Sequence, residues 1–213
     1  QGGWVVRQVN IRWSGDGRRP YKLVQARRSG WRHYFEGVAI MTRLPVIYHD
    51  SKNLGDDGRV ALRANLELPA GSAGTRRQSL DFVSVQLHHG VARAEARIEQ
   101  AMNLVGWINE KRRVPLQVIC GDFGETPVGG SIKFMRQSYR SAYAEANRRD
   151  PLATYPTNLL QPQPVDATCL DYAFLSAAVY RVTEAAIFGD QPSPDDDTLY
   201  PSDHVGILVG LEV

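Results

Sequence analysis

The chain has 213 residues, of which 43% are hydrophobic and 23% are charged. This length and composition predict one domain, spanning residues 1–213, with a core of its own. A net charge of +2 argues against a non-specific nuclease, which needs a broad basic face. Since no apolar run approaches the roughly 18–20 residues of a membrane span, we expect a soluble protein, cytoplasmic by default.

Charge and cysteines are unevenly placed along the chain. Residues 1–50 are rich in Lys and Arg, whereas residues 190–203 carry Asp and no base. A solvated surface is the favoured interpretation of such runs, and an electrostatic binding patch is the alternative.

Cys120 and Cys169 lack the spacing of a zinc site, so we expect buried thiols, with a single disulfide as the other possibility.

The first half of the chain alternates between unpatterned and strand-like segments. Residues 1–35 show little periodicity, and the apolar run over residues 36–43 then predicts a buried strand that Pro45 stops. Alternating apolar residues predict a half-buried strand over 60–67, and a further strand is expected over 80–87. After residue 90 the apolar spacing changes to three and four, which predicts an amphipathic helix from 98 to the basic residues 111–113.

The second half returns to strands. A short apolar strand over 115–120 leads into Gly121 and Asp122, and a short helix is expected over 131–137. Loops rich in Pro are expected at 151–164 and 189–201. The predicted strands between and after these loops cover residues 168–176, 179–188 and 204–213. This order predicts stacked sheets flanked by helices.

Three acid-bearing segments stand at or within these predicted strands. Asp122 follows one apolar strand, Asp171 lies within another, and the pair Asp203 and His204 opens the last. Carboxylates suit a hard cation such as Mg²⁺ or Mn²⁺. A histidine beside a carboxylate suits proton transfer, with a second carboxylate holding the imidazole. The combination predicts a phosphoesterase site more strongly than any single acid does.

These segments resemble the motifs of the endonuclease/exonuclease/phosphatase superfamily. Five segments match in the family's order: Glu36 to Pro45, Val83 to Gly90, Val118 to Pro127, Cys169 to Ser176 and Tyr200 to Val205. The resemblance implies an α/β fold of the DNase I-like kind. That fold is a four-layer α/β sandwich, with two packed, mostly antiparallel sheets flanked by helices.

The resemblance also implies roles for individual residues. Asp203 would approach the metal, and Asp122 would position the attacking water or bind a second metal ion. His204 would act as general base or stabilise the transition state, with Asp171 orienting it. Glu36 corresponds to a carboxylate that orients a further histidine in the family.

The chain departs from the family's pattern in three places. The further histidine is replaced by Gln86, which can donate a hydrogen bond but cannot carry a proton, and His88 and His89 are interpreted as a structural or substrate-rim pair. Gly124 stands where the family has a phosphate-binding Asn. Nothing before Glu36 matches the first strands or the metal-binding Glu of the family, so we expect an N-terminally incomplete domain that binds Mg²⁺ or Mn²⁺ weakly.

Two hypotheses about function follow. The first is a metal-dependent phosphoesterase that hydrolyses a phosphodiester or phosphomonoester, with nucleic acid or a small phosphoester as substrate. The second is a catalytically degenerate member that binds nucleic acid or a phosphorylated ligand. A fold fragment with no site of its own ranks below both. Substrate and oligomeric state stay open.

Overall fold

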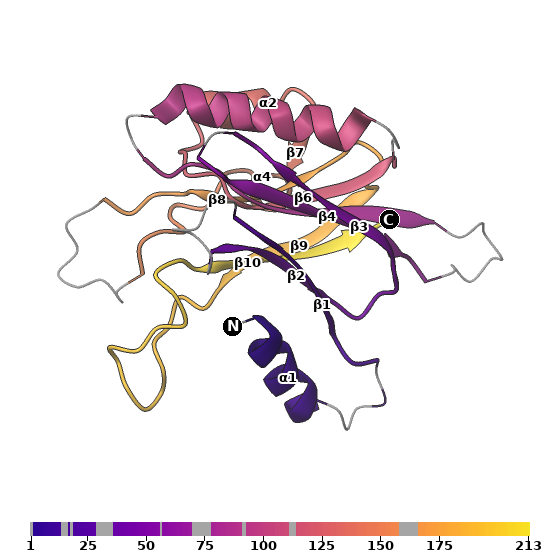
Figure 1. The fold of residues 1–213 in the computed structure, drawn as a ribbon. Coiled ribbons are helices and arrows are strands. Elements are labelled where there is room, and N and C mark those ends of the chain that lie inside the picture. Colours follow the sequence, from indigo (N-terminus) through magenta and orange to yellow (C-terminus); the bar gives the residue numbers. More distant parts are fainter. Residues whose placement is uncertain are drawn as a thin grey trace.

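The chain folds into stacked α and β layers in the computed structural model (Figure 1). The structure describes residues 2–13, 17, 19–28, 36–55, 57–69, 78–90, 93–110, 114–157 and 166–213. From top to bottom in Figure 1, helix α2 covers a large sheet, a second β layer lies beneath that sheet, and helix α1 lies below the second layer. The DNase I-like α/β sandwich predicted from the sequence is confirmed.

The large sheet has six strands in the order β3-β4-β5-β6-β8-β7. Their bounds are β3 (Val46–Asn53), β4 (Val60–Glu67), β5 (Ser79–Gln86), β6 (Leu116–Asp122), β7 (Arg140–Ser141) and β8 (Asp171–Leu175). Within the described residues β5 and β6 pair in parallel and the other neighbours pair antiparallel. The parallel pair needs a crossover connection, and α2 (Ala94–Glu110) supplies it.

Strand β4 is buried on both faces, so its prediction as a half-buried strand was wrong. Leu62 and Ala64 face the second β layer, whereas Ala61 packs in the core beneath α2. Arg63 is also buried, because its guanidinium binds Asp50 at 2.7 and 2.9 Å and lies 4.8 Å from the ring of Trp107. Polar residues on this strand therefore gave the appearance of a solvent-exposed face.

Helix α2 covers one face of the large sheet (Figure 1). The buried side of α2 includes Ala101, Leu104 and Ile108, while Met102, expected on that side, is 54% exposed. Two short helices follow β6, namely α3 (Gly130–Met135) and α4 (Ala142–Asn147). The helix predicted over residues 131–137 agrees with α3 to within about one turn, whereas α4 was not predicted.

The second β layer consists of two hairpin-like pairs in the part of the chain that the structure describes. β1 (Lys22–Arg27) pairs with β2 (Gly37–Thr42), and β9 (Arg181–Phe188) pairs with β10 (Gly206–Glu212), both antiparallel. Helix α1 (Gly2–Trp13) and β1 lie where the sequence showed little periodicity. The edge strand β3 was also missed, because Pro45 was interpreted as a stop rather than as a corner before a new strand.

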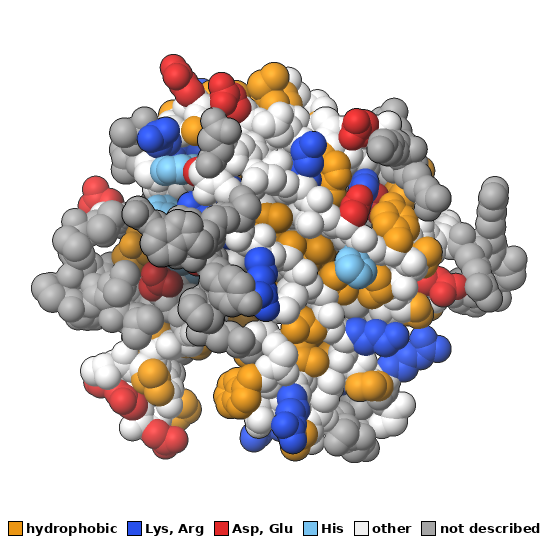
Figure 2. Space-filling model, viewed as in Figure 1, with side chains coloured by type: hydrophobic (Ala, Val, Ile, Leu, Met, Phe, Trp, Pro, Cys, Tyr) orange, Lys and Arg blue, Asp and Glu red, His pale blue; other side chains and the backbone are white. Residues whose placement is uncertain are grey.

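The surface carries both signs of charge. Figure 2 shows acidic side chains on the loop at the lower left, which is the 189–201 loop, and basic side chains around α1 and β1.

None of the helices in the described part of the chain is both long and apolar enough to cross a membrane.

Both cysteines are free thiols, so the single disulfide left open by the sequence does not form. Burial raises the pKa of Cys120 and of Cys169 to about 12, which makes each a poor nucleophile.

Candidate active site

The last residues of β5 and β6 lie beside the first residue of β8. Together they bring polar side chains to the same end of three neighbouring strands of the large sheet. Gln86, the last residue of β5, is in register with Asp122, the last residue of β6. Asp122 is in turn in register with Asp171, the first residue of β8. Residues in register on adjacent strands project to the same face, so these three side chains share the face toward the second β layer.

The segment before β10 supplies the other half of the site. His204 Nδ1 lies 2.8 Å from Asp171 Oδ2, which links the second β layer to the large sheet. One cavity of about 580 Å³ is lined by Gln86, Asp122, Asp171, Asp203 and His204. The structure therefore brings together five of the six residues that the sequence singled out.

Four further residues line this cavity: His89, Tyr155, Leu170 and Ser202. The sequence suggested a structural or substrate-rim role for His89 and assigned none to the other three. The Tyr155 ring packs against His204, with ring centroids 4.7 Å apart and planes tilted by 44°. This contact covers one face of the imidazole and restricts its orientation.

Two threonines form hydrogen bonds to the backbone of the segments that line the cavity. Thr154 Oγ1 accepts hydrogen bonds from the backbone N–H groups of Leu170 and Asp171, at 2.9 and 3.1 Å. Thr157 donates from its backbone N–H to the carbonyl oxygen of Asp203 at 2.8 Å, and from its hydroxyl to that of Ser202 at 2.7 Å. The loop that the sequence showed only as rich in Pro thus holds Asp171 and Asp203 in place.

Burial and neighbouring charges shift the pKa of Asp122 and of His204. Burial raises the pKa of Asp122, and the charge of Asp171 raises it further, against hydrogen bonds from Gly124 and Gln86 that lower it. Burial lowers the pKa of His204, but the hydrogen bond and charge of Asp171 outweigh it, so the pKa of His204 lies above its ordinary value. Both shifts are upward, because a neighbouring negative charge raises the pKa of a carboxyl group and of an imidazole alike.

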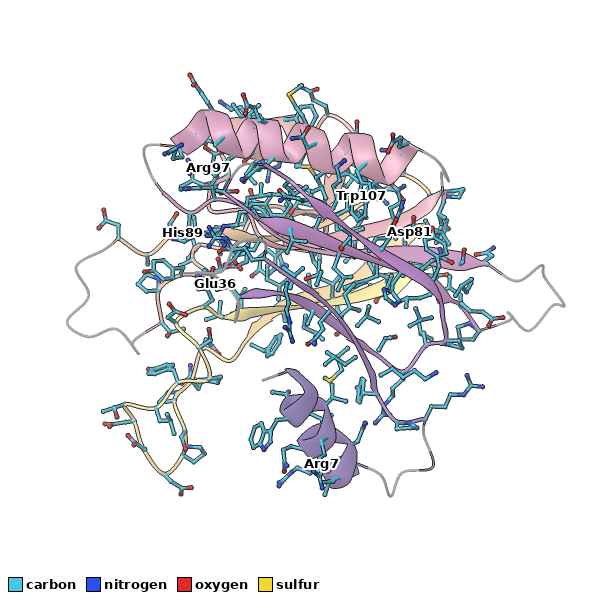
Figure 3. The ribbon with its side chains drawn as sticks, viewed as in Figure 1. Arg7, Glu36, Asp81, His89, Arg97 and Trp107 are labelled. Carbon is cyan, nitrogen blue, oxygen red and sulfur yellow. The ribbon has the colours of Figure 1, made fainter. Side chains whose placement is uncertain are left out.

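Glu36 is not among the residues that line the cavity. Its carboxylate binds the Arg28 guanidinium at 2.5 Å, and Arg28 also donates to the carbonyl oxygen of Asp57. Figure 3 shows Glu36 at the same end of the large sheet as His89, with Asp81 toward the opposite end. Its predicted catalytic role stays a prediction.

The described residues do not complete a metal-binding set. Asp122 and Asp203 carry the hard oxygen atoms that Mg²⁺ and Mn²⁺ prefer. Among the residues that the structure describes, however, no group of three or more His, Cys, Asp or Glu side chains is placed to hold a metal ion. The metal-ligand roles of Asp122 and Asp203 therefore stay predictions.

Comparison with known proteins identifies the family of this chain. The family model described as the endonuclease/exonuclease/phosphatase family matches residues 1–204. The chain belongs to the endonuclease/exonuclease/phosphatase family. A search of curated proteins found no match.

Solved structures of this family share the fold. The human Nocturnin catalytic domain is 18% identical, with 97% of this chain and 76% of that chain covered and a TM-score of 0.68. A mannosyl-6-phosphatase from Bacteroides thetaiotaomicron is 16% identical, with coverage of 98% and 81% and a TM-score of 0.72. D. rerio TDP2, solved with a single-strand DNA product, is 16% identical, with coverage of 97% and 81% and a TM-score of 0.70.

Proposed function

We propose that this endonuclease/exonuclease/phosphatase domain hydrolyses phosphoester bonds, with the phosphoryl group in the cavity lined by Asp122, Asp171 and His204. The observation that carries the proposal is the contact of 2.8 Å between His204 Nδ1 and Asp171 Oδ2 at the cavity wall. A carboxylate on Nδ1 holds the imidazole in one orientation and leaves Nε2 free to exchange a proton with substrate.

The two perturbed groups suit opposite ends of a hydrolytic step. As a water oxygen bonds to phosphorus, Asp122 takes the proton that the water loses, a task that its raised pKa favours. As the bond between phosphorus and the leaving oxygen breaks, His204 in its protonated form donates a proton to that oxygen. The raised pKa of His204 keeps more of it protonated near neutral pH than an ordinary histidine would be.

Two further assignments belong to the proposal. Asp203, beside His204, is the residue closest to a divalent cation, and residues 1–213 form one domain. Mg²⁺ or Mn²⁺ would supply charge stabilisation at the phosphoryl group. No step above depends on it, since the described side chains form no complete set of ligands.

Binding of a phosphorylated ligand without turnover is the second candidate. Gln86 favours it, because an amide at the end of β5 can bind a phosphate oxygen but cannot carry a proton. Nocturnin was solved with a sulfate anion and TDP2 with a DNA product, so nucleic acid and small phosphoesters both stay open as substrates for this chain.

Hydrolysis assays separate the two candidates. Bis(p-nitrophenyl) phosphate and p-nitrophenyl phosphate would be offered with Mg²⁺ or Mn²⁺ to the unmodified chain and to His204→Ala and Asp203→Ala. We expect each variant to lose about 100-fold or more in rate. His49→Ala, at an exposed position of β3, is the matched control and should keep full activity. Turnover that persists unchanged in His204→Ala would contradict the proposal, and phosphate binding with no turnover would favour the second candidate.

A further inference from the structure

A buried arginine behind the cavity wall controls the orientation of Gln86. Arg59 is 3% exposed, and its Nη1 donates a hydrogen bond to Gln86 Oε1 at 2.6 Å. Because a guanidinium can only donate, the amide of Gln86 has to present its oxygen to Arg59. The amide nitrogen therefore faces the other way, 3.4 Å from Asp122 Oδ2. One of its two hydrogens points toward Asp122, and the other stays available to a ligand.

The same arginine determines the tautomer of His89. Arg59 Nη2 lies 2.6 Å from His89 Nδ1. Since Arg59 has no lone pair to offer, Nδ1 has to accept, which requires a neutral imidazole with its proton on Nε2. His89 lines the cavity, so this tautomer gives the wall an N–H donor.

Gly124 allows His89 to reach the cavity. A Cβ atom at Gly124 would lie 2.5 Å from the carbonyl oxygen of His88 and 3.0 Å from the Cα of His89. The glycine also has a φ of +59°, a region that side chains disfavour. The backbone of residues 88 and 89 thus packs against the turn after Asp122 at a distance that a larger residue would prevent.

The charge of Arg59 is balanced at short range. Burial and the charge of Arg28 lower its pKa, while Asp57, Glu36 and Asp122 oppose that shift. Its Nε lies 4.0 Å from Asp57 Oδ2 and has no hydrogen-bond partner among the described residues. The two terminal nitrogens, both directed at cavity residues, therefore carry the specific contacts of this side chain.

We propose that Arg59 is a positioning residue that presents Gln86 and His89 as a pair of neutral N–H donors to a phosphoryl oxygen in the cavity. Two preorganised donors in a partly buried site stabilise an oxyanion without having to reorient when it binds. The proposal rests on the proposed function for the identity of the ligand. Its test uses inorganic phosphate, so it does not require turnover.

The first measurement is the tautomer of His89 in the unmodified protein. The chain has five histidines, so the imidazole nitrogens of a ¹⁵N-histidine-labelled sample are few enough to assign, with His89→Gln identifying its signal. We expect a neutral ring with the proton on Nε2. A proton on Nδ1 would overturn the proposal, and this result needs no variant that has to fold.

The second measurement is phosphate binding by variants, followed through the same signal and by calorimetry. Arg59→Met should weaken binding about tenfold or more, as expected when a hydrogen bond to a charged ligand is lost. The phosphate affinity of Arg59→Lys should lie between those of Arg59→Met and the unmodified protein. One ammonium group cannot reproduce the planar guanidinium that contacts both Gln86 and His89. Arg181→Met is the charge-matched control, since Arg181 lies at the exposed start of β9 and pairs with Glu212.

Affinity for phosphate that is equal in Arg59→Met and in the unmodified protein would contradict the assignment. If Arg59→Met fails to fold, His89→Ala serves in its place, because it removes one of the two proposed donors at the cavity wall and leaves Arg59 unchanged. A protein that binds phosphate through His89 but shows no hydrolysis would refute the proposed function and leave this inference standing.

Discussion

Replacing Glu125 with Gln tests how the turn that carries Asp122 is held. Glu125 is 8% exposed, and its Oε2 accepts from the backbone N–H and the hydroxyl of Ser131 at 2.9 and 2.5 Å. Its Oε1 lies 3.3 Å from Nη2 of the buried Arg97. The glutamine oxygen can keep the Ser131 contacts, but its NH₂ group then faces the Arg97 guanidinium and cannot accept.

The expected loss is about 3 kcal/mol of unfolding free energy at pH 7. Breaking a buried ion pair by removing one partner typically costs 3–5 kcal/mol. Arg97 keeps an acceptor in the carbonyl oxygen of Gly90 at 2.6 Å, so the lower end of that range applies. Urea denaturation followed by the fluorescence of the four tryptophans measures the difference.

The pKa of Glu125 determines how the stability difference between Glu125→Gln and the unmodified protein changes with pH. Burial raises the pKa of Glu125, but the hydrogen bonds of Ser131 and the charge of Arg97 lower it more, so its pKa in the folded protein lies below the ordinary value. The stabilisation is then complete above the pKa of the unfolded chain and is lost as the pH falls through the lower, folded value. The difference between the two proteins should therefore shrink below about pH 4.

Exposed Glu99 on α2 provides the control, and Glu99→Gln should change stability by less than about 0.5 kcal/mol. A cost below about 1 kcal/mol for Glu125→Gln, or a difference that stays constant between pH 7 and pH 3, would refute the reasoning.

Three further predictions concern the backbone, the dyad and the cation. Gly121→Ala should lower stability by about 3 kcal/mol in thermal or urea unfolding, because Gly121 has a φ of +148° and a Cβ there would overlap the carbonyl oxygen of Val85. Gly106→Ala, in open space on α2, should instead raise stability by up to about 1 kcal/mol, and equal effects would contradict the argument. Asp171→Asn should lower the rate of phosphoester hydrolysis about 100-fold while the circular dichroism spectrum is unchanged, and an unaltered rate would remove the dyad from the mechanism. Mn²⁺ binding followed by electron paramagnetic resonance should be weak and should weaken about tenfold more in Asp203→Asn, whereas equal binding by both proteins would exclude Asp203 as a ligand.

Local patterns and motif order in the sequence were enough to identify the family and most of the strands. Apolar alternation and glycine or proline breaks are local signals, and they located β4, β5, β6 and the strands near the C-terminus. The order of motifs around Asp122, Asp171 and His204 carried the ancestry, because those residues keep a fixed relation to the strands that bear them. Local signals failed for α1 and β1, whose apolar residues show no clear periodicity, and for β3, where Pro45 was interpreted as a stop.

Only the tertiary structure decided which side chains meet. Gln86 is separated by 36 residues from Asp122 and by 27 from Arg59, and each contact depends on the pairing of strands and not on spacing in the sequence. Tertiary structure also places Glu36 in contact with Arg28, and it places His89 at the cavity. A hydrogen bond between distant residues requires both backbones to be placed first, and hydrophobic packing of the whole sheet does that. For this reason the sequence could identify the acids of the site but could not show the arginine that orients its donors.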